Sequence, residues 1–182
     1  WKFGGICRTG AADAIEYGKS ALRMSWILAG LGALTFCFFL SEGAIADWSA
    51  LYLNKTAGTP AGRAAAGYAL FAAAMAIGRL SGDALRHRFG PAALVRTGSI
   101  TAAAGLAMAL AVPVTPVALA GFAIVGAGCS IVVPIVFAAT GGLKDTGTGA
   151  ALAFVTTSGY LGLFAGPPVI GFVAEAVTLR VS

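Results

Sequence analysis

The sequence predicts an all-α integral membrane protein in which five helices cross the bilayer. Hydrophobic residues occupy 58% of its 182 positions, and charged residues occupy only 10%. Several stretches of about 18 or more residues carry almost no charge, and a helix of ~20 residues spans the ~30 Å hydrocarbon core. These stretches are apolar on every side, whereas surface helices of a water-soluble bundle need a polar face. A soluble helical bundle is therefore the weaker alternative.

The N-terminal segment, residues 1–25, mixes charged and apolar side chains. We expect it to form a cytoplasmic loop or a short helix at the membrane surface. The first span follows at about 26–53, and it would extend ~42 Å as one helix. Because this exceeds the apolar thickness of a bilayer, the helix should tilt, break or protrude.

Four further spans follow, separated by short segments rich in glycine, proline or charge. The segments "NKTAGTPAG", "PVTP" and "TGGLKDTGTG" each predict a turn, because proline and glycine disfavour a continuous helix. The predicted spans lie at about 63–80, 92–112, 117–139 and 150–173. With the first span, they make residues 26–182 a partial transmembrane domain.

A cluster of charge, "GRLSGDALRHRFG" at residues 78–90, interrupts the apolar spans and predicts a loop at 81–91. Of the 12 lysines and arginines, nine fall on the side of the N-terminus and only three, Lys55, Arg63 and Arg180, on the other. Positive residues favour the cytoplasmic side. The N-terminal segment and the 81–91 loop are therefore predicted to be cytoplasmic. Asp83 is not explained by this bias, since acidic residues contribute little to it.

Several classes of function find no support in the sequence. The net charge of +5 comes without the motifs or interleaved aromatic residues of nucleic-acid-binding proteins. Cys7, Cys37 and Cys129 lack metal-binding or redox spacing. No metalloprotease motif and no nucleophile paired with a base is present, so we expect neither an enzyme, nor a cofactor, nor a metal site, nor a nucleic-acid partner.

The charged cluster resembles a loop motif of the major facilitator superfamily of secondary transporters. The family pattern is a glycine, an aspartate, two arginines and a closing glycine, matched here by Gly78, Asp83, Arg86, Arg88 and Gly90. Two further segments are similar to the family: "SEGAIADWSALYL" resembles the seventh helix of bacterial members near the fucose-permease-like branch, and "GYLGLFAGPPVIG" resembles the eleventh.

The resemblance implies a half bundle of the major facilitator type, comprising helices 7 to 11 of a twelve-helix protein. Helix 12 and an N-terminal six-helix half would then belong to the same, longer polypeptide. The implied location is the bacterial inner membrane, and the implied partners are the lipid bilayer and a small-molecule substrate. The function predicted is secondary active transport of a small solute by alternating access, coupled to protons. A non-transporting membrane sensor or scaffold derived from a transporter half is the alternative.

Glu42 is the most informative residue within the predicted spans. It lies ~24 Å along a helix from Trp26, in the outer part of the hydrocarbon core, where a charged side chain costs roughly 2.5–3.5 kcal/mol on insertion scales. Thr35, Glu42 and Ser49 are spaced by seven and share one helix face. We expect that face to line an aqueous cavity and Glu42 to bind substrate or a proton. The alternative is a structural hydrogen bond.

Other polar residues in the spans are weaker candidates. Asp47 lies near the interface, where it would either contribute to the site or be a solvated helix end. Tyr68, together with Thr156 and Tyr160 one turn apart on the last span, would contact either substrate or neighbouring helices.

The resemblance also implies a conformational gate at the charged cluster. Asp83 would pair with basic residues in one access state and release them in the other, with Arg79 and Arg88 as its local partners. Simple capping of the loop is the alternative role for Asp83. The predicted gate residues are Gly78, Arg79, Asp83, Arg86, Arg88 and Gly90.

Overall fold

The computed structural model describes the backbone of residues 6–143 and 148–176 and the side chains of 25–143 and 149–175. All regular elements in these ranges are helices, and five are long and apolar enough to cross a membrane. The predicted fold class is thereby confirmed. The five candidate membrane spans are Ser25–Thr56, Ala61–Leu80, Pro91–Ala111, Thr115–Gly141 and Gly149–Glu175. Their ends lie within about one helical turn of the predicted spans.

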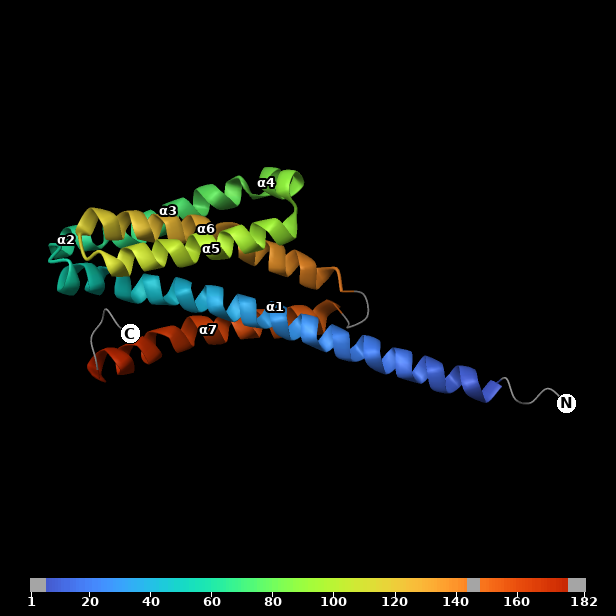
Figure 1. Cartoon of the computed structure of the whole chain (residues 1–182). Coiled ribbons are helices and arrows are strands. Elements are labelled where there is room, and N and C mark those ends of the chain that lie inside the picture. Colours follow the sequence, from blue (N-terminus) through green and yellow to red (C-terminus); the bar gives the residue numbers. More distant parts are fainter. Residues whose placement is uncertain (1–5, 144–147, 177–182) are drawn as a thin grey trace.

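The first helix, α1 (Ile6–Thr56), is continuous over 51 residues. It contains no proline, so nothing in its sequence forces a break. The backbone from residue 6 to residue 24 therefore continues the helix, where the sequence had suggested a loop or a separate short helix. Of the three ways to accommodate a long span, α1 protrudes: its N-terminal part projects past the other helices (Figure 1).

A tight turn follows α1 and leads into α2 (Ala61–Ala64) and α3 (Ala66–Leu80). Gly58 adopts a positive φ of 64°, which a side chain would disfavour, and Pro60 precedes the first turn of α2. The Asn54 side-chain amide donates to the Thr59 carbonyl oxygen at 2.9 Å. The Thr59 hydroxyl lies 2.7 Å from that of Thr115, which connects this turn to the start of α6.

The charged cluster was predicted to form a loop. It forms a short helix instead, α4 (Gly82–Phe89). Asp83 lies in its first turn, and the three basic side chains that follow lie in its last turn. This order places each charge where the helix dipole stabilises it. Gly90, with a φ of 76°, ends the helix, and Pro91 begins the next one. The loop prediction was wrong because a rise in charge ends an apolar span without preventing a short polar helix from forming after it.

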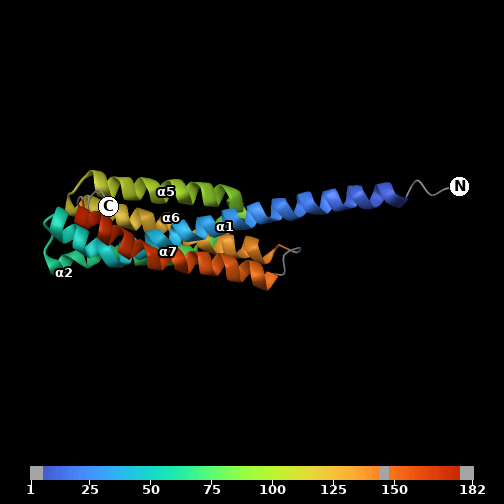
Figure 2. The same ribbon diagram turned by 90° about the horizontal axis from the view of Figure 1, so that it is seen from below.

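Three long helices complete the bundle: α5 (Pro91–Ala111), α6 (Thr115–Gly141) and α7 (Thr148–Ala176). The helix α6 lies at the centre, with α5 and α3 packed against it, while α7 packs along α1 (Figures 1 and 2). Half of the most apolar part of α6 is buried, against at most 28% in the other four spans. The core is therefore built around α6.

Glycines bring α5 and α6 into close contact. Gly98 faces Gly128, and Gly105 faces Gly121, so the two pairs are one heptad apart on each helix. A Cβ atom added at Gly98 would lie 2.7 Å from the Gly128 carbonyl oxygen, and one added at Gly105 would lie 2.8 Å from that of Gly121. Such distances leave room for no side chain, so the backbones themselves are in contact.

Glycines also bring the backbones of α6 and α3, and of α7 and α1, into contact. A Cβ atom at Gly126 of α6 would collide with the Phe71 carbonyl oxygen of α3, and one at Gly162 of α7 would collide with the Phe36 carbonyl oxygen of α1. Gly166 contacts the α1 backbone one turn further on, as its spacing from Gly162 predicts.

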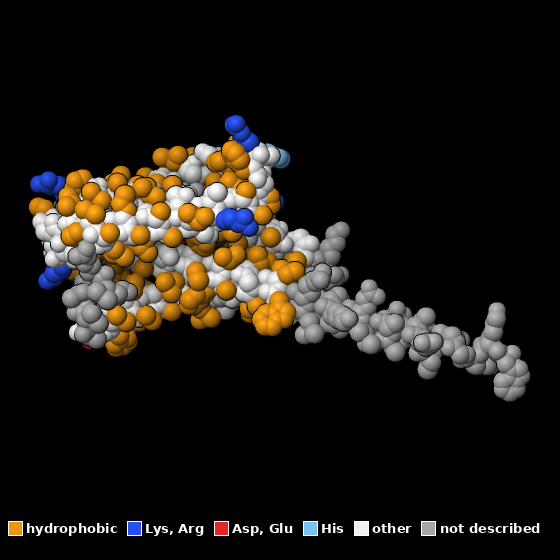
Figure 3. All heavy atoms as spheres, in the orientation of Figure 1, with side chains coloured by type: hydrophobic (Ala, Val, Ile, Leu, Met, Phe, Trp, Pro, Cys, Tyr) orange, Lys and Arg blue, Asp and Glu red, His pale blue; other side chains and the backbone are white. Residues whose placement is uncertain are grey.

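The face of the molecule seen in Figure 3 is mostly apolar, and the lysine and arginine side chains visible on it lie toward the ends of the bundle. Large hydrophobic side chains such as Ile77, Leu161 and Phe172 are 65%, 60% and 75% exposed. In water, so large an apolar surface would drive association, whereas lipid chains solvate it.

The glycine contacts predict a difference between two otherwise similar substitutions. Gly162→Ala should lower the free energy of unfolding by about 1–3 kcal/mol, because the new methyl group meets the Phe36 backbone. Gly30→Ala should be neutral or stabilising by about 0.5–1 kcal/mol, because no atom lies within 4 Å of the added Cβ in the middle of a helix. Unfolding in detergent, followed by circular dichroism, measures both. Equal stability of the two variants would contradict the backbone contact.

Candidate functional site

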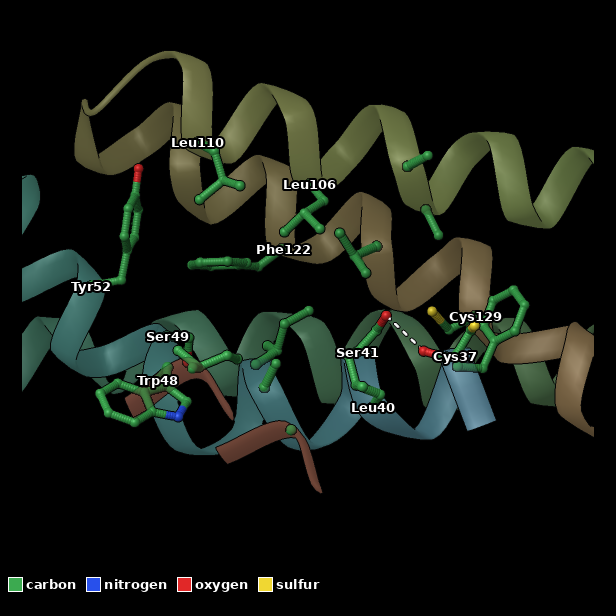
Figure 4. Close-up of a pocket in the computed structure, with 18 of the residues that line it drawn as sticks. Cys37, Leu40, Ser41, Trp48, Ser49, Tyr52, Leu106, Leu110, Phe122 and Cys129 are labelled. Carbon is green, nitrogen blue, oxygen red and sulfur yellow. Dashed lines mark hydrogen bonds between the residues drawn. The ribbon is translucent and has the colours of Figure 1, made fainter. Parts of the chain in front are cut away.

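A cavity of about 610 Å³ opens between α1, α5 and α6, with α7 at one edge (Figure 4). Its wall is mostly aliphatic and aromatic. The polar or sulfur-bearing side chains that line it are Cys37, Ser41, Trp48, Ser49, Tyr52, Ser99 and Cys129.

Tyr52 fixes one end of this cavity. Its hydroxyl donates to the Ala109 carbonyl oxygen at 2.8 Å, and its ring meets Phe122 edge-on at 6.2 Å. These contacts join α1 to both α5 and α6. The sequence analysis missed Tyr52, because a tyrosine near the end of an apolar span carries no signal of a partner far along the chain.

Two polar atoms at the cavity have no hydrogen-bond partner among the described residues. Ser49 is only 2% exposed, yet its hydroxyl is unpaired, and the indole Nε1 of Trp48 is likewise buried and unpaired. Each such atom costs about 1–3 kcal/mol.

The three residues predicted to share a face of α1 have different surroundings. Thr35 is 1% exposed, donates to the Leu31 carbonyl oxygen at 2.8 Å and packs against Gly159 of α7. Ser49 lines the cavity. Glu42 is half-buried and is not part of the cavity wall. Of the predicted site residues, Ser49 is thus the one that contributes to this cavity.

Glu42 lies beside a row of aromatic rings that continues onto α7. Phe39 precedes it by three residues, which makes the two side chains neighbours on the helix surface. The ring centroids of Phe39 and Tyr160 are 6.0 Å apart, and those of Tyr160 and Phe164 are 6.5 Å apart. Thr156, one turn before Tyr160, is half-buried.

Charges near Glu42 are few. In the part of the chain whose side chains are described, no lysine, arginine or histidine forms a salt bridge with its carboxylate. Glu42 and Arg79 both lie close enough to the Cys129 thiol to act on it electrostatically.

Tyr68 and Asp47 lie apart from this group. Tyr68 is exposed on α3, with its ring 6.1 Å from that of Phe71. Asp47 is exposed on α1. No hydrogen bond or ring contact between described side chains connects either residue to Glu42.

The predicted gate residues gather at the end of α3 and along α4. Arg79, Asp83 and Arg86 border a hollow of about 70 Å³ against Pro134 of α6. No ion pair within 4.0 Å links Asp83 to an arginine among the described side chains. Arg88 instead lies 5.4 Å from the centre of the Phe89 ring, a cation–π distance.

The two predicted gate glycines, Gly78 and Gly90, lie at positions where the fold itself favours a glycine. A Cβ atom on Gly78 would collide with Ser130, a buried residue whose hydroxyl donates to the Ala127 carbonyl oxygen at 2.6 Å. Gly90 provides the positive φ at the end of α4. Across the described ranges, no three His, Cys, Asp or Glu side chains gather into a possible metal site.

Comparison with known proteins identifies relatives. No protein-family model matches the chain. The chain is 40% identical over 157 residues to an uncharacterised MFS-type transporter of Yersinia pestis. The matched segment makes up 86% of this chain and 41% of the relative. It is 38% identical to the membrane protein MosC of Rhizobium meliloti, over 81% of this chain and 36% of the relative. It is 35% identical to an uncharacterised transporter of Sinorhizobium fredii, over 82% of this chain and 40% of the relative.

These matches agree with the five long apolar helices and with the resemblance seen in the sequence. The chain spans less than half the length of each of these relatives. It has the five apolar helices of a multi-pass membrane protein, and it is similar to an MFS-type transporter, a membrane protein and a further transporter, each over more than four fifths of its own length.

Proposed function

We propose that the chain is part of a secondary active transporter that moves a small solute across the bacterial inner membrane by alternating access. The observation that carries this proposal is the 40% identity to an MFS-type transporter over 86% of the chain. Since the relatives are more than twice as long, the complete transporter would include further helices of the same polypeptide. The basic residues at the α4 end of the bundle support a cytoplasmic position for that end.

Glu42 is the residue proposed to couple transport to protons. A half-buried carboxylate within a membrane span, without a salt bridge among the described side chains, can exchange its charge for a proton when the site changes access. Ionisable residues at this depth are functional candidates by default because their insertion is costly.

The apolar cavity supports the proposal that further helices complete the bundle. Its wall is mostly aliphatic and aromatic, like the lipid-facing surface of a membrane helix. An apolar helix of the longer polypeptide seated there would cover this wall by close packing. Cys37, which is exposed at this cavity, offers a way to test this.

Replacing Glu42 tests the coupling role. In the full-length protein, Glu42→Gln should abolish proton-driven accumulation of solute in proteoliposomes, because the amide cannot carry a proton on and off. Glu175→Gln, which removes an exposed carboxylate at the end of α7, serves as the control and should accumulate solute normally. Normal accumulation by Glu42→Gln would contradict the coupling role.

Replacing Asp83 tests the gate. A carboxylate in the first turn of a helix contributes about 0.3–2 kcal/mol, enough to bias a two-state equilibrium. Asp83→Asn should therefore lower kcat severalfold and leave substrate affinity nearly unchanged, as measured by initial transport rates and equilibrium binding. An unchanged kcat with a collapsed affinity is the outcome that rules out a gate.

Thiol labelling tests whether the cavity is covered. In the full-length protein with all other cysteines replaced by serine, Cys37 should react slowly with a membrane-permeant maleimide. A cysteine introduced as Ile100→Cys in the cysteine-free protein also lies within a membrane span, but it is outside the cavity and Ile100 is 63% exposed, so it should react faster than Cys37. Equal labelling rates would show that no helix covers the cavity.

A further inference from the structure

The row of aromatic rings beside Glu42 forms a surface distinct from the apolar cavity. Phe39, Tyr160 and Phe164 follow one another with ring centroids 6.0 Å and 6.5 Å apart. Glu42 lies one turn along α1 from Phe39. None of these four residues belongs to the wall of the cavity. We call them the aromatic–carboxylate face.

The rings of this face are available to a ligand. Tyr160 is 52% exposed and Phe164 is 72% exposed, so a large part of each ring is uncovered. The planes of these two rings are 26° from parallel, whereas those of Phe39 and Tyr160 are 49° apart. The row therefore offers extended π surface rather than only ring edges.

The charge of the face selects one class of ligand. Aromatic faces attract cations, and the carboxylate of Glu42 has no salt bridge among the described side chains. Arg79, the arginine of α3, borders the hollow at Asp83 and forms no ion pair within 4.0 Å with Glu42 among the described side chains. An anionic solute would meet the uncompensated charge of Glu42, and a neutral solute would leave that charge uncompensated.

We propose that the aromatic–carboxylate face binds a small organic cation, in which a quaternary or protonated centre lies against the rings and is neutralised by Glu42. This inference rests on the proposed transport function and names its substrate class. Because a proton and the cation would occupy the same carboxylate, binding of one excludes the other.

Two ions of matched size and shape test whether the aromatic–carboxylate face binds cations in preference to anions. Tetraphenylphosphonium and tetraphenylborate are both lipophilic, and they differ in charge. Titration calorimetry with the purified full-length protein should show saturable binding of the phosphonium cation and none of the borate anion. Equal binding of the two ions, or no binding of the cation, overturns the proposal.

Four variants of the full-length protein locate the site. Glu42→Gln should weaken cation binding by tenfold or more, and Glu42→Asp should retain most of it, which separates loss of charge from loss of structure. Phe164→Leu should weaken binding about two- to fivefold, the size of an exposed cation–π contact. Phe172→Leu removes another exposed ring from α7 and should change nothing, since Phe172 has no contact with the row.

The same measurements separate this proposal from the proposed transport function. Cation binding that Glu42→Gln leaves intact overturns the aromatic–carboxylate site, whatever the protein transports. Cation binding that depends on Glu42 supports the site. If such binding occurs without proton-driven flux of the cation in proteoliposomes, the site stands and the transport function fails.

Discussion

Contact between helix backbones at glycine is the interaction on which this bundle depends. In a bilayer there is little hydrophobic gain from bringing apolar helices together, because lipid chains are as apolar as the side chains. Packing must come from close fit, and glycines supply it at three interfaces: α5 with α6, α3 with α6, and α7 with α1. With α6 buried at the centre, α3 and α5 are held as its two neighbours.

This arrangement gives α1 two different sides. One side borders the apolar cavity, where Tyr52 reaches across to α5. The other side carries Phe39 and Glu42, which continue into the exposed rings of α7. A single helix thus contributes to a surface suited to another apolar helix and to a surface with unbalanced charge.

The sequence was sufficient to predict the five spans, because their length and lack of charge are local properties. It was not sufficient to predict that α4 is a helix. An acidic residue at the start and arginines at the end are typical of a helix, but the abrupt rise in charge favoured a loop. Thr35, Glu42 and Ser49 were predicted to line one cavity together, yet of the three only Ser49 lies in the wall of the described cavity. Thr35 packs against α7, whereas Ser49 lines the cavity. Both environments are formed by helices that lie far from α1 in the sequence.

For the same reason, Tyr52 could not be identified from the sequence, although it is central to one end of the cavity. Its partner, the Ala109 carbonyl oxygen, is 57 residues away and is a backbone atom that any residue would provide. The contact between the rings of Phe39 and Tyr160 could likewise not be predicted from the sequence, because the two residues belong to helices at opposite ends of the described chain.

The pairing of α1 with α7 also bears on how the protein is made. The first helix leaves the ribosome long before the last one, so its glycine-contacting face enters the membrane without its final partner. By contrast, α5 and α6 are joined by a turn of a few residues and can pair almost as soon as they are synthesised. The contacts of α1 with α3 and α6 can therefore form before its longer interface with α7 is completed.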